Sequence, residues 1–374
     1  MKLAVINTLP VPSGQASVNR ILSYSKGLVE LGVEVEVFSS GKKEDSFGEI
    51  YGVKYRNCGG DGIIGLFTAL NSILKAVRKG NFDVVFLVSN SLLLIYPLWV
   101  TCRLNHIKLL QEKSEFPFVL MKKGFLHRLY AKFYVNTTYR LFDGLIVMTK
   151  PLMEFFKDKV RKNCRLFEMP MTVDTERFVI EKGKDNPYGD YIAYCGNMTG
   201  NKDGVLNLID SFSKLEDKFP NIKLLLIGGT NKPEQFELLK SQVKEQGIKN
   251  IVFYGRATRE EMPELLVNAK LLALARPTSL QSTGGFPTKL GEYLATGNPI
   301  VVTKVGDIPN YLNDSNAYLV EPDDNNAFAN AISEVFKDYP RAVEKGLKGK
   351  ELALNVFNSR IQSERLKLFL QTLI

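Results

Sequence analysis

Two charged residues stand three positions apart behind a double glycine, in the segment GGFPTKLGEYLATGNPIVV at 284–302. The apolar spacing predicts a helix over 288–296, and the unpaired N–H groups at a helix amino terminus favour anions such as phosphate. Lys289 places a positive charge at this helix end, and Lys202, in the loop GNMTGNKDG, can add a second. Glu292 can accept two hydrogen bonds, as a carboxylate does from a ribose diol. The pattern indicates a site for a nucleotide diphosphate.

A second interpretation of the same spacing needs no ligand. Oppositely charged residues three apart on a helix commonly form a salt bridge at the surface, and Lys289 and Glu292 have that separation. The spacing alone leaves the nucleotide site and the surface salt bridge equally open.

A regular framework must hold these residues, and the sequence repeats one pattern in each half. The first half begins with a strand (KLAVIN), a glycine-containing loop, a helix over about 18–31 and a second strand (GVEVEVFSS), which form a parallel β-α-β unit. The second half begins again with the strand YIAYCGN, a helix in KDGVLNLIDSFSKLEDKFP and the strand IKLLLIGG. We therefore predict an α/β protein with two doubly wound, Rossmann-like domains, whose ligands bind at the carboxyl ends of the strands.

Three segments divide the chain. Residues 1–170 form the predicted amino-terminal domain and residues 171–355 the predicted carboxyl-terminal domain, joined near EMPMTVDTERF. Residues 356–374 form a helix that either packs on the second domain or crosses back to the first. A chain of 374 residues suits two domains, because single hydrophobic cores stop growing below this size.

The composition is that of a globular protein, with 45% apolar and 24% charged residues. The start, MKLAVINTLP, lacks the apolar run of a signal peptide, and the four cysteines lack metal or disulfide spacing. We therefore expect a cytoplasmic, reduced protein without a metal site. The apolar stretch 82–104 is divided by polar residues at 89–91 and by Pro97, and it is interpreted as a buried strand and helix rather than a membrane span.

The net charge of +9 belongs to the first half of the chain. Residues 1–174 hold 24 Lys and Arg against 15 Asp and Glu, whereas the remaining residues hold 25 of each.

The segment 116–142, here called the basic arm, contains no acid and mixes cations with aromatic and aliphatic residues. It is either an amphipathic segment on an anionic membrane surface or a core-facing helix with a solvated basic side. No nucleic-acid motif accompanies the charge, so no nucleic-acid partner is expected. The cations of the arm are Lys122, Lys123, Arg128, Lys132 and Arg140.

The run FPTKLGEYLATGNPIVVTKVGDIPNYLNDSNAYLVEPDDNNAFANAI resembles the carboxyl-terminal signature of the family 4 glycosyltransferases. In that family a Pro and a Lys precede a Glu, an EYLAxGxPVV stretch follows, and a PDD segment opens a helix. EMPMTVDTERF, CGNMTGNKDG and NIVFYGRATREEMPELLVNAKLLAL resemble other family segments in the same order. The resemblance extends over essentially the whole chain. It implies the GT-B fold, with two domains facing a cleft, and retaining sugar transfer from a nucleotide sugar without a required metal or other cofactor.

The resemblance also implies roles for single residues. Glu292 matches the glutamate that holds the ribose, and Lys202 matches a lysine that binds the diphosphate. Gly255 and Arg256 match the segment that lines the base pocket, and Gly14 matches an amino-terminal loop that closes on donor and acceptor. The implied donor-binding residues are Gly14, Gly196, Asn197, Lys202, Gly255, Arg256, Gly284, Gly285, Phe286, Pro287, Thr288, Lys289 and Glu292.

Two positions in the second half depart from the family pattern. Gly284 stands eight residues before Glu292, where the family usually has a first glutamate, and we expect the backbone amides of Gly284 and Gly285 to replace it. Asn197 stands near the position of a phosphate-binding arginine, and we expect Lys289 to supply the missing charge.

The first half departs from the family at a histidine beside the reacting carbon. Neither His106 nor His127 fits that position. The corresponding segment, QEKSEFP, offers two glutamates in a predicted loop at a strand end, where a carboxylate can orient the acceptor hydroxyl or take its proton. A salt bridge with a neighbouring lysine is the alternative for Glu115. The predicted catalytic residues are Glu112, Glu115, Lys202 and Lys289.

These features together predict a retaining glycosyltransferase of the bacterial surface-polysaccharide type. It is expected to move a sugar from a UDP- or GDP-sugar to a lipid-linked glycan acceptor, peripherally bound at the inner face of the membrane. Two alternatives remain. One is a nucleotide-sugar epimerase of the same fold, and the other is a non-catalytic glycosyltransferase-like subunit, which the missing glutamate and histidine favour.

Overall fold

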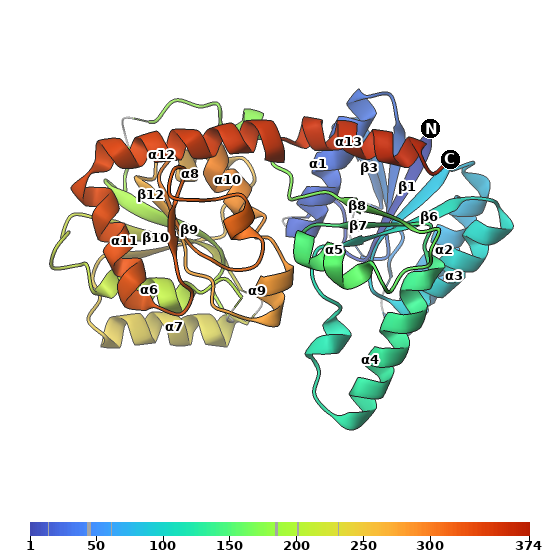
Figure 1. Cartoon of the computed structure of the whole chain (residues 1–374), viewed down its shortest axis with the longest axis horizontal. Helices are drawn as coiled ribbons and strands as arrows, with labels where there is room; N and C mark the ends of the chain where they lie inside the picture. The colour runs from blue at the N-terminus through green and yellow to red at the C-terminus, as the bar shows by residue number, and fades with distance from the viewer. Residues whose placement is uncertain (14, 43–45, 61, 184–185, 200–201, 231) are drawn as a thin grey trace. The chain divides into compact units, whose positions relative to one another are not determined.

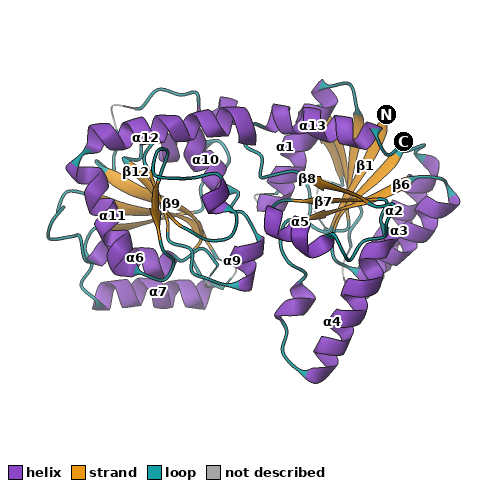
Figure 2. Ribbon diagram, in the orientation of Figure 1, coloured by secondary structure: helices purple, strands orange, loops and turns teal. Residues whose placement is uncertain are grey.

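The chain folds into two compact units, each a parallel or mostly parallel β-sheet flanked by helices (Figures 1 and 2). Unit 1 comprises Met1–Thr172 and Ser359–Ile374, and unit 2 comprises Val173–Asn358. The predicted α/β class with two Rossmann-like domains is confirmed, whereas the cleft between them stays a prediction. The computed structural model describes residues 1–13, 15–42, 46–60, 62–183, 186–199, 202–230 and 232–374.

Unit 1 is built on a sheet whose described strands follow the order β3-β4-β2-β1-β5-β6-β7-β8. Every described pair is parallel except β3 with β4. The central strands are almost wholly buried, as expected of a parallel sheet covered on both faces. The strands are β1 Lys2–Asn7, β2 Glu34–Ser39, β3 Phe47–Ile50, β4 Val53–Asn57, β5 Val84–Val88, β6 Lys108–Lys113, β7 Gly144–Val147 and β8 Arg165–Glu168.

The carboxyl-terminal helix α13 (Ser359–Gln371) belongs to unit 1 although the chain reaches it through unit 2. Its Leu366 and Leu370 are part of the core beneath α1, and the Oγ atom of Ser363 lies 3.1 Å from the carbonyl oxygen of Tyr24 in α1. The other helices of unit 1 are α1 Ala16–Glu30, α2 Gly62–Lys79, α3 Leu92–Leu104, α4 Phe125–Thr137 and α5 Lys150–Phe156, with 3₁₀ turns η1 Phe118–Met121 and η2 Thr138–Leu141.

Unit 2 contains a parallel sheet whose described strands follow the order β11-β10-β9-β12-β13-β14. The strands are β9 Tyr191–Asn197, β10 Lys223–Gly229, β11 Ile251–Gly255, β12 Leu271–Leu274, β13 Ile300–Thr303 and β14 Tyr318–Val320. The helices are α6 Val205–Ser213, α7 Pro233–Glu245, α8 Glu261–Val267, α9 Leu280–Gly284, α10 Lys289–Thr296, α11 Asn325–Lys337 and α12 Tyr339–Leu352, with short turns η3 Thr175–Phe178, η4 Ile308–Asn310 and η5 Ala353–Phe357.

Two sequence expectations differ in their outcome. The apolar stretch 82–104 forms β5 and α3, as predicted, and no helix in the described part of the chain is long and apolar enough to cross a membrane. The helix predicted in KDGVLNLIDSFSKLEDKFP is shorter than expected. It ends at Ser213 because the following residues turn through i→i−3 hydrogen bonds, such as Leu215 N to the carbonyl of Phe212.

Candidate functional site

The strand order of unit 2 reverses between β9 and β12. From β9 the chain proceeds outward through β10 to β11, and it then returns to begin β12 on the other side of β9. Ligand sites in open parallel sheets form at the carboxyl edge where the order reverses in this way. Two segments leave the sheet at this point, the loop after β9 (198–204) and the segment between β12 and α10 (275–288).

Lys289, the first residue of α10, is buried against the loop after β9. Its Nζ lies 2.7 Å from Oδ2 of Asp203 and 4.9 Å from the ring centroid of Tyr194, and its side chain is 13% exposed. Burial by itself lowers the pKa of Lys289, but Tyr194 and Asp203 raise this pKa by more. Burial likewise raises the pKa of Asp203, but Lys289 and Arg276 lower it by more. Both groups are therefore charged at neutral pH.

Arg276 follows β12 and is almost completely buried. Its Nε lies 3.6 Å from Oδ1 of Asp203 and 3.5 Å from the carbonyl oxygen of Lys202, and its Nη1 lies 3.5 Å from the carbonyl oxygen of Gly285. One guanidinium therefore contacts both segments at the reversal point. Arg276 and Lys289 share the single carboxylate of Asp203, which leaves an excess of positive charge at this edge of the sheet.

Neither Asp203 nor Arg276 is predicted from the sequence. Two signals were available. Asp203 directly follows the candidate Lys202, and Arg276 directly follows the apolar run of β12. Because a charge beside a buried strand is costly without a partner, such an arginine indicates a nearby acid.

Two glycines allow this close approach. Gly196, in β9, has a φ of +155°, and a Cβ there would collide with Nζ of Lys289. Gly204 has a φ of +70°, and a Cβ there would collide with the carbonyl group of Ala275. A glycine at position 196 leaves room for the ammonium group of Lys289 beside β9, whereas the donor-binding role of Gly196 stays a prediction.

Glu292 lies one turn after Lys289 in α10 but binds a different cation. Its Oε1 lies 3.4 Å from Nη1 of Arg177 in η3, whose Nη2 donates a hydrogen bond of 2.5 Å to the carbonyl of Arg259. Burial raises the pKa of Glu292 even though Arg177, Arg259 and Lys289 each lower it. The salt bridge between Lys289 and Glu292 considered from spacing is therefore wrong. Arg177 is a further residue that the sequence did not predict.

The glycine segment before α10 differs from its expected structure. Gly284 is the last residue of α9 rather than part of a loop. The amide of Gly285 donates to the carbonyl of Gln281 at 3.1 Å, so the expected replacement of the missing acid by this amide is wrong. The amides of Thr288 and Lys289 have no acceptor within hydrogen-bond distance among the described residues. These two amides, at the start of α10, are available to an anionic ligand.

Phe286 and Pro287 fix the segment between α9 and α10 in place. The ring of Phe286 is buried, with its centroid 5.6 Å from that of Tyr311 and 5.5 Å from that of Phe357. Pro287 is also buried, and its carbonyl accepts a hydrogen bond of 3.0 Å from the amide of Leu290. Both side chains face the protein interior, so their contribution to a donor site is to fix the backbone of Thr288 and Lys289.

Two exposed candidate residues lie at the end of β9 and in the loop that follows it. Oδ1 of Asn197 accepts a hydrogen bond of 3.1 Å from the amide of Thr199, which shapes the loop locally. The side chain of Lys202 is exposed beside Asp203, whose own side chain is 12% exposed. Lys202 therefore extends the positive charge of the buried group to the surface.

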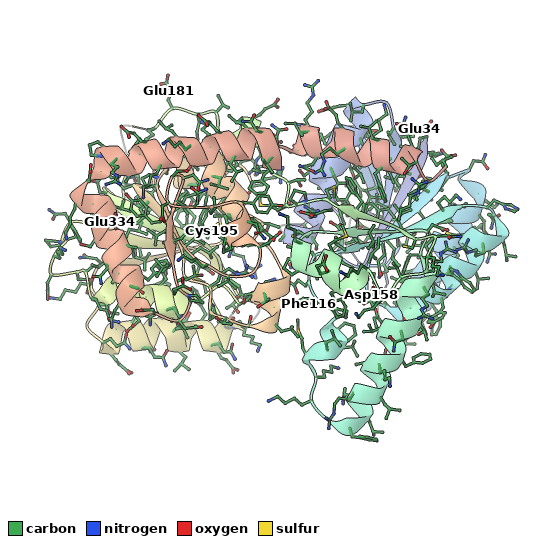
Figure 3. The ribbon with its side chains drawn as sticks, in the orientation of Figure 1. Glu34, Phe116, Asp158, Glu181, Cys195 and Glu334 are labelled. Carbon is green, nitrogen blue, oxygen red and sulfur yellow. The ribbon has the colours of Figure 1, made fainter. Side chains whose placement is uncertain are left out.

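The remaining donor candidates lie further along the same edge or outside the described residues. Gly255 ends β11 with a φ of +88°, and Arg256 is exposed, with Nη2 3.3 Å from the carbonyl oxygen of Thr230. Gly14 lies outside the described residues. Cys195, labelled in Figure 3, lies in β9. Its amide donates a hydrogen bond of 2.9 Å to the hydroxyl of Tyr293, which links α10 to the sheet.

In unit 1, Glu112 is the fifth residue of β6 rather than part of a loop, so its expected position is wrong. Its side chain is 3% exposed, and its Oε1 lies 2.5 Å from Nε of Arg20. The other nitrogens of Arg20 donate to the carbonyls of Met169 at 2.9 Å and Pro170 at 2.8 Å. The carboxylate of Glu112 therefore compensates the charge of the buried Arg20, and this arginine hydrogen-bonds the backbone that follows β8.

A buried lysine and a half-buried glutamate follow Glu112 at the end of β6. Lys113 is buried, and its Nζ donates to Oδ1 of Asn90 and lies 4.8 Å from the ring centroid of Tyr139. Burial lowers the pKa of Lys113 to about 7. Glu115 is half-buried in the bend after β6, at the carboxyl edge of the sheet, and remains the predicted residue facing the acceptor. Among the described residues, no group of His, Cys, Asp or Glu is placed to hold a metal ion.

Residues 189–338 match the model of the family described as glycosyl transferases group 1. Unit 2 therefore carries a group 1 glycosyltransferase domain. The predicted enzyme class, a glycosyltransferase, is confirmed at the level of this domain.

Solved structures with the same fold cover the whole chain. One is Anabaena Alr3699/HepE in complex with UDP, with a TM-score of 0.78, 14% identity and 100% coverage of both chains. Another is sucrose-phosphate synthase from Thermosynechococcus elongatus, with a TM-score of 0.80, 17% identity and coverage of 100% of this chain and 98% of that one. These likenesses establish the GT-B fold predicted from the sequence.

Curated relatives match only part of the chain. The trehalose phosphorylase of Grifola frondosa is 25% identical over 169 residues, which is 41% of this chain and 22% of that protein. The GDP-mannose-dependent alpha-(1-6)-phosphatidylinositol monomannoside mannosyltransferase of Mycolicibacterium smegmatis is 25% identical over 221 residues, which is 54% of this chain and 56% of that protein. The chain thus spans between about a fifth and about half of the length of these relatives.

Proposed function

We propose that this protein is a retaining glycosyltransferase that takes its sugar from a UDP- or GDP-sugar bound at the carboxyl edge of unit 2. The observation that carries the proposal is the buried group of Lys289, Asp203 and Arg276 at the reversal of the strand order. A fixed excess of positive charge at this position suits a diphosphate. The proposal is further supported by Anabaena Alr3699/HepE, which has the same fold and has been solved with UDP and with UDP-glucose.

Each residue of the proposed site has one task. Lys289, Lys202 and the free amides of Thr288 and Lys289 stabilise the negative charge that develops on the leaving diphosphate. Glu292 accepts hydrogen bonds from the ribose diol, and Arg177 keeps its carboxylate in place. The lysines and amides supply the charge stabilisation that a divalent ion supplies in other transferases, so the proposal assigns no metal or other cofactor.

The acceptor site of the proposal lies in unit 1. Glu115, at the carboxyl edge of the sheet, orients the acceptor hydroxyl and takes its proton as the new glycosidic bond forms. The proposed acceptor is a lipid-linked glycan used in the assembly of a surface polysaccharide. The M. smegmatis relative, named as a phosphatidylinositol monomannoside mannosyltransferase, supports an acceptor of this class.

The basic arm supports a membrane location for that acceptor. Its helix α4 extends away from the sheet of unit 1 (Figure 1). Phe116 lies where the arm begins, and its ring centroid is 5.2 Å from that of Phe155 in α5 (Figure 3). The most exposed apolar side chains are Phe125 at 70% and Leu126 at 79%. The large apolar side chains that the arm exposes are Phe118, Met121, Phe125, Leu126, Leu129, Tyr130 and Phe133.

This exposure supports the membrane interpretation of the arm over the core-facing one. A core-facing helix would bury its apolar residues, but α4 buries only Ala131, Tyr134 and Val135, near its attachment to the unit. The exposed aromatic and aliphatic side chains alternate with five cations and no acid. Such a surface suits the interface of an anionic bilayer, where apolar side chains enter the acyl boundary and lysines contact the headgroups. We therefore place the protein in the cytoplasm, peripherally bound at the inner face of the membrane.

The donor site is tested by calorimetric titration with UDP and GDP. Lys289→Ala is expected to weaken binding about 100-fold and Glu292→Ala at least about tenfold, because each removes charge-assisted hydrogen bonds to the nucleotide. The matched controls are Lys240→Ala and Glu237→Ala, which break an exposed pair with the same three-residue spacing on α7. Affinities for UDP and GDP that stay unchanged in both site variants would overturn the site.

The membrane contact is tested with sedimented vesicles of phosphatidylglycerol and of phosphatidylcholine. Replacement of Lys122, Lys123 and Lys132 by Gln is expected to weaken binding to the anionic vesicles about 100-fold, since each lysine contributes about 1 kcal/mol near such a surface. The control replaces the three exposed cations of α2, Lys75, Arg78 and Lys79, by Gln. Equal losses in both triple variants would show that only the net charge matters and would contradict the proposal.

A second candidate function is a non-catalytic subunit. Gly284 in place of the family's first glutamate favours it, because the amide of Gly285 is already used by α9 and does not compensate. Transfer or hydrolysis of a UDP- or GDP-sugar by the purified chain would exclude this candidate.

A further inference from the structure

Unit 1 contains a basic hollow at the edge of its sheet where the strands begin. It has a volume of about 320 Å³ and is lined by Arg103, Lys108, Asp143, Arg161, Asn163 and Arg165 together with the end of the chain. Lys108 and Arg165 begin β6 and β8, and Asp143 directly precedes β7. The hollow therefore lies at the amino edge of the sheet. Glu115 and the base of the basic arm lie at the carboxyl edge, so the hollow is a separate feature.

Two of the cations in the hollow are held rigidly by one acid. Asp143 is buried and accepts a hydrogen bond of 2.9 Å from the amide of Leu109. The same carboxylate binds Nη2 of Arg103 at 3.3 Å and Nη2 of Arg161, whose Nε also donates to the carbonyl of Phe142 at 3.0 Å. Both guanidinium groups are therefore fixed before any ligand arrives, which reduces the entropy lost on binding.

Among the described residues, no carboxylate lies within salt-bridge distance of Lys108 or Arg165. The hollow thus holds four cationic side chains against the single carboxylate of Asp143. Four cations beside one acid favour a multiply charged anion, because arginine binds phosphate oxygens through paired hydrogen bonds.

We propose that this hollow binds a small ligand carrying two phosphate groups. Among the described residues, the lining contains no aromatic side chain that could stack on a nucleobase, so recognition rests on the phosphates. Arg103 and Arg161 contact one phosphate from their fixed positions, and Lys108 and Arg165 contact the other. A free diphosphate and the diphosphate headgroup of a lipid both offer two phosphate groups.

Titration of the full chain with inorganic diphosphate tests the proposal. The double variant Lys108→Ala/Arg165→Ala is expected to bind diphosphate at least about tenfold more weakly, because two charge-assisted hydrogen-bond donors are lost. The control is Lys75→Ala/Arg78→Ala on α2, which changes the net charge of unit 1 by the same amount. Any diphosphate that binds unit 2 contributes equally to both variants, so their difference reports the hollow alone.

The outcomes separate the two sources of phosphate. A loss confined to Lys108→Ala/Arg165→Ala supports a site for free diphosphate. Unchanged diphosphate binding, together with a loss of sedimentation on vesicles that contain diacylglycerol diphosphate in this variant alone, supports a headgroup site. Equal affinities of both variants for both probes would overturn the proposal, and matched thermal melting curves confirm that each variant is folded.

Discussion

The carboxyl edge of unit 2 and the basic arm of unit 1 hold their positive charges in opposite ways. At the carboxyl edge, Lys289 and Arg276 are buried and share Asp203. In the arm, the cations are exposed and the sequence supplies no acid. Burial of a charge costs several kcal/mol unless a partner is present, whereas an exposed lysine is stabilised by water. The first arrangement suits a ligand of fixed geometry, and the second suits a surface whose charges are mobile.

Among the substitutions that test this comparison, the largest effect on the free energy of unfolding is expected at Asp203. Asp203→Asn leaves Lys289 and Arg276 buried without a countercharge, which should reduce the free energy of unfolding by about 3–5 kcal/mol at pH 7. The pKa of Asp203 is lowered in the folded state, so the contribution of its charge is complete at pH 7 and is lost as the pH falls through the folded pKa. The measurement is urea unfolding followed by circular dichroism.

The control for that prediction is Asp210→Asn in α6. Asp210 pairs with Lys214 at 2.7 Å, but the side chain of Asp210 is 52% exposed, so its loss should cost less than about 1 kcal/mol. Equal losses of stability in the two variants would show that the ion pairs of Asp203 contribute no more to stability than an exposed ion pair does.

A smaller effect is expected from the buried lysine at the base of the arm. The folded-state pKa of Lys113 is lowered to about 7, so between about pH 7 and the ordinary lysine pKa the unfolded chain binds more protons. The stability of unit 1 should therefore rise with pH above 7, by at most about 1.4 kcal/mol per pH unit. Lys113→Met should lack this rise. The chain's single tryptophan, Trp99 in α3, reports unit 1 by its fluorescence.

An equal slope of stability against pH in wild type and Lys113→Met would show that Lys113 titrates normally. It would also remove the contrast between a buried lysine at the base of the arm and the exposed lysines further along it.

The smallest effect on stability is expected at the exposed tip of the arm. Phe125→Ser and Leu126→Ser should change the free energy of unfolding of unit 1 by less than about 0.5 kcal/mol, because both side chains are already in water. Both substitutions should weaken binding to phosphatidylglycerol vesicles. Tyr134→Ala, at the buried end of the same helix, should by contrast cost about 3–5 kcal/mol. A large loss of stability at Phe125 would mean that the tip packs against the protein.

The sequence predicted the strands and the carboxyl edge of unit 2 because apolar periodicity and glycine positions are local signals. It did not predict which charges pair, because the partners are distant in the chain. Arg20 meets Glu112 across 92 residues, and Lys289 meets Asp203 across 86. Spacing within the predicted helix left a salt bridge between Lys289 and Glu292 open and gave no sign of Asp203 as the partner. Local patterns therefore located the candidate site, whereas its electrostatics depended on the fold.

Gly284 shows a second limit of local patterns. Its position relative to Glu292 identified a missing acid, and a double glycine ordinarily indicates a flexible loop with available amides. The preceding residues form a capping box, in which Ser279 and Ser282 bind each other's backbone amides, and this stabilises the short helix α9 up to Gly284. The capping residues, rather than the glycines, determined the local structure.

The most direct test of the central claim is a crystal structure of the chain with UDP or GDP bound. We predict that Nζ of Lys289 lies within hydrogen-bond distance of a diphosphate oxygen and that the carboxylate of Glu292 accepts hydrogen bonds from the ribose hydroxyls. A nucleotide bound elsewhere in unit 2, with Lys289 still paired only with Asp203 and Glu292 only with Arg177, would contradict the account.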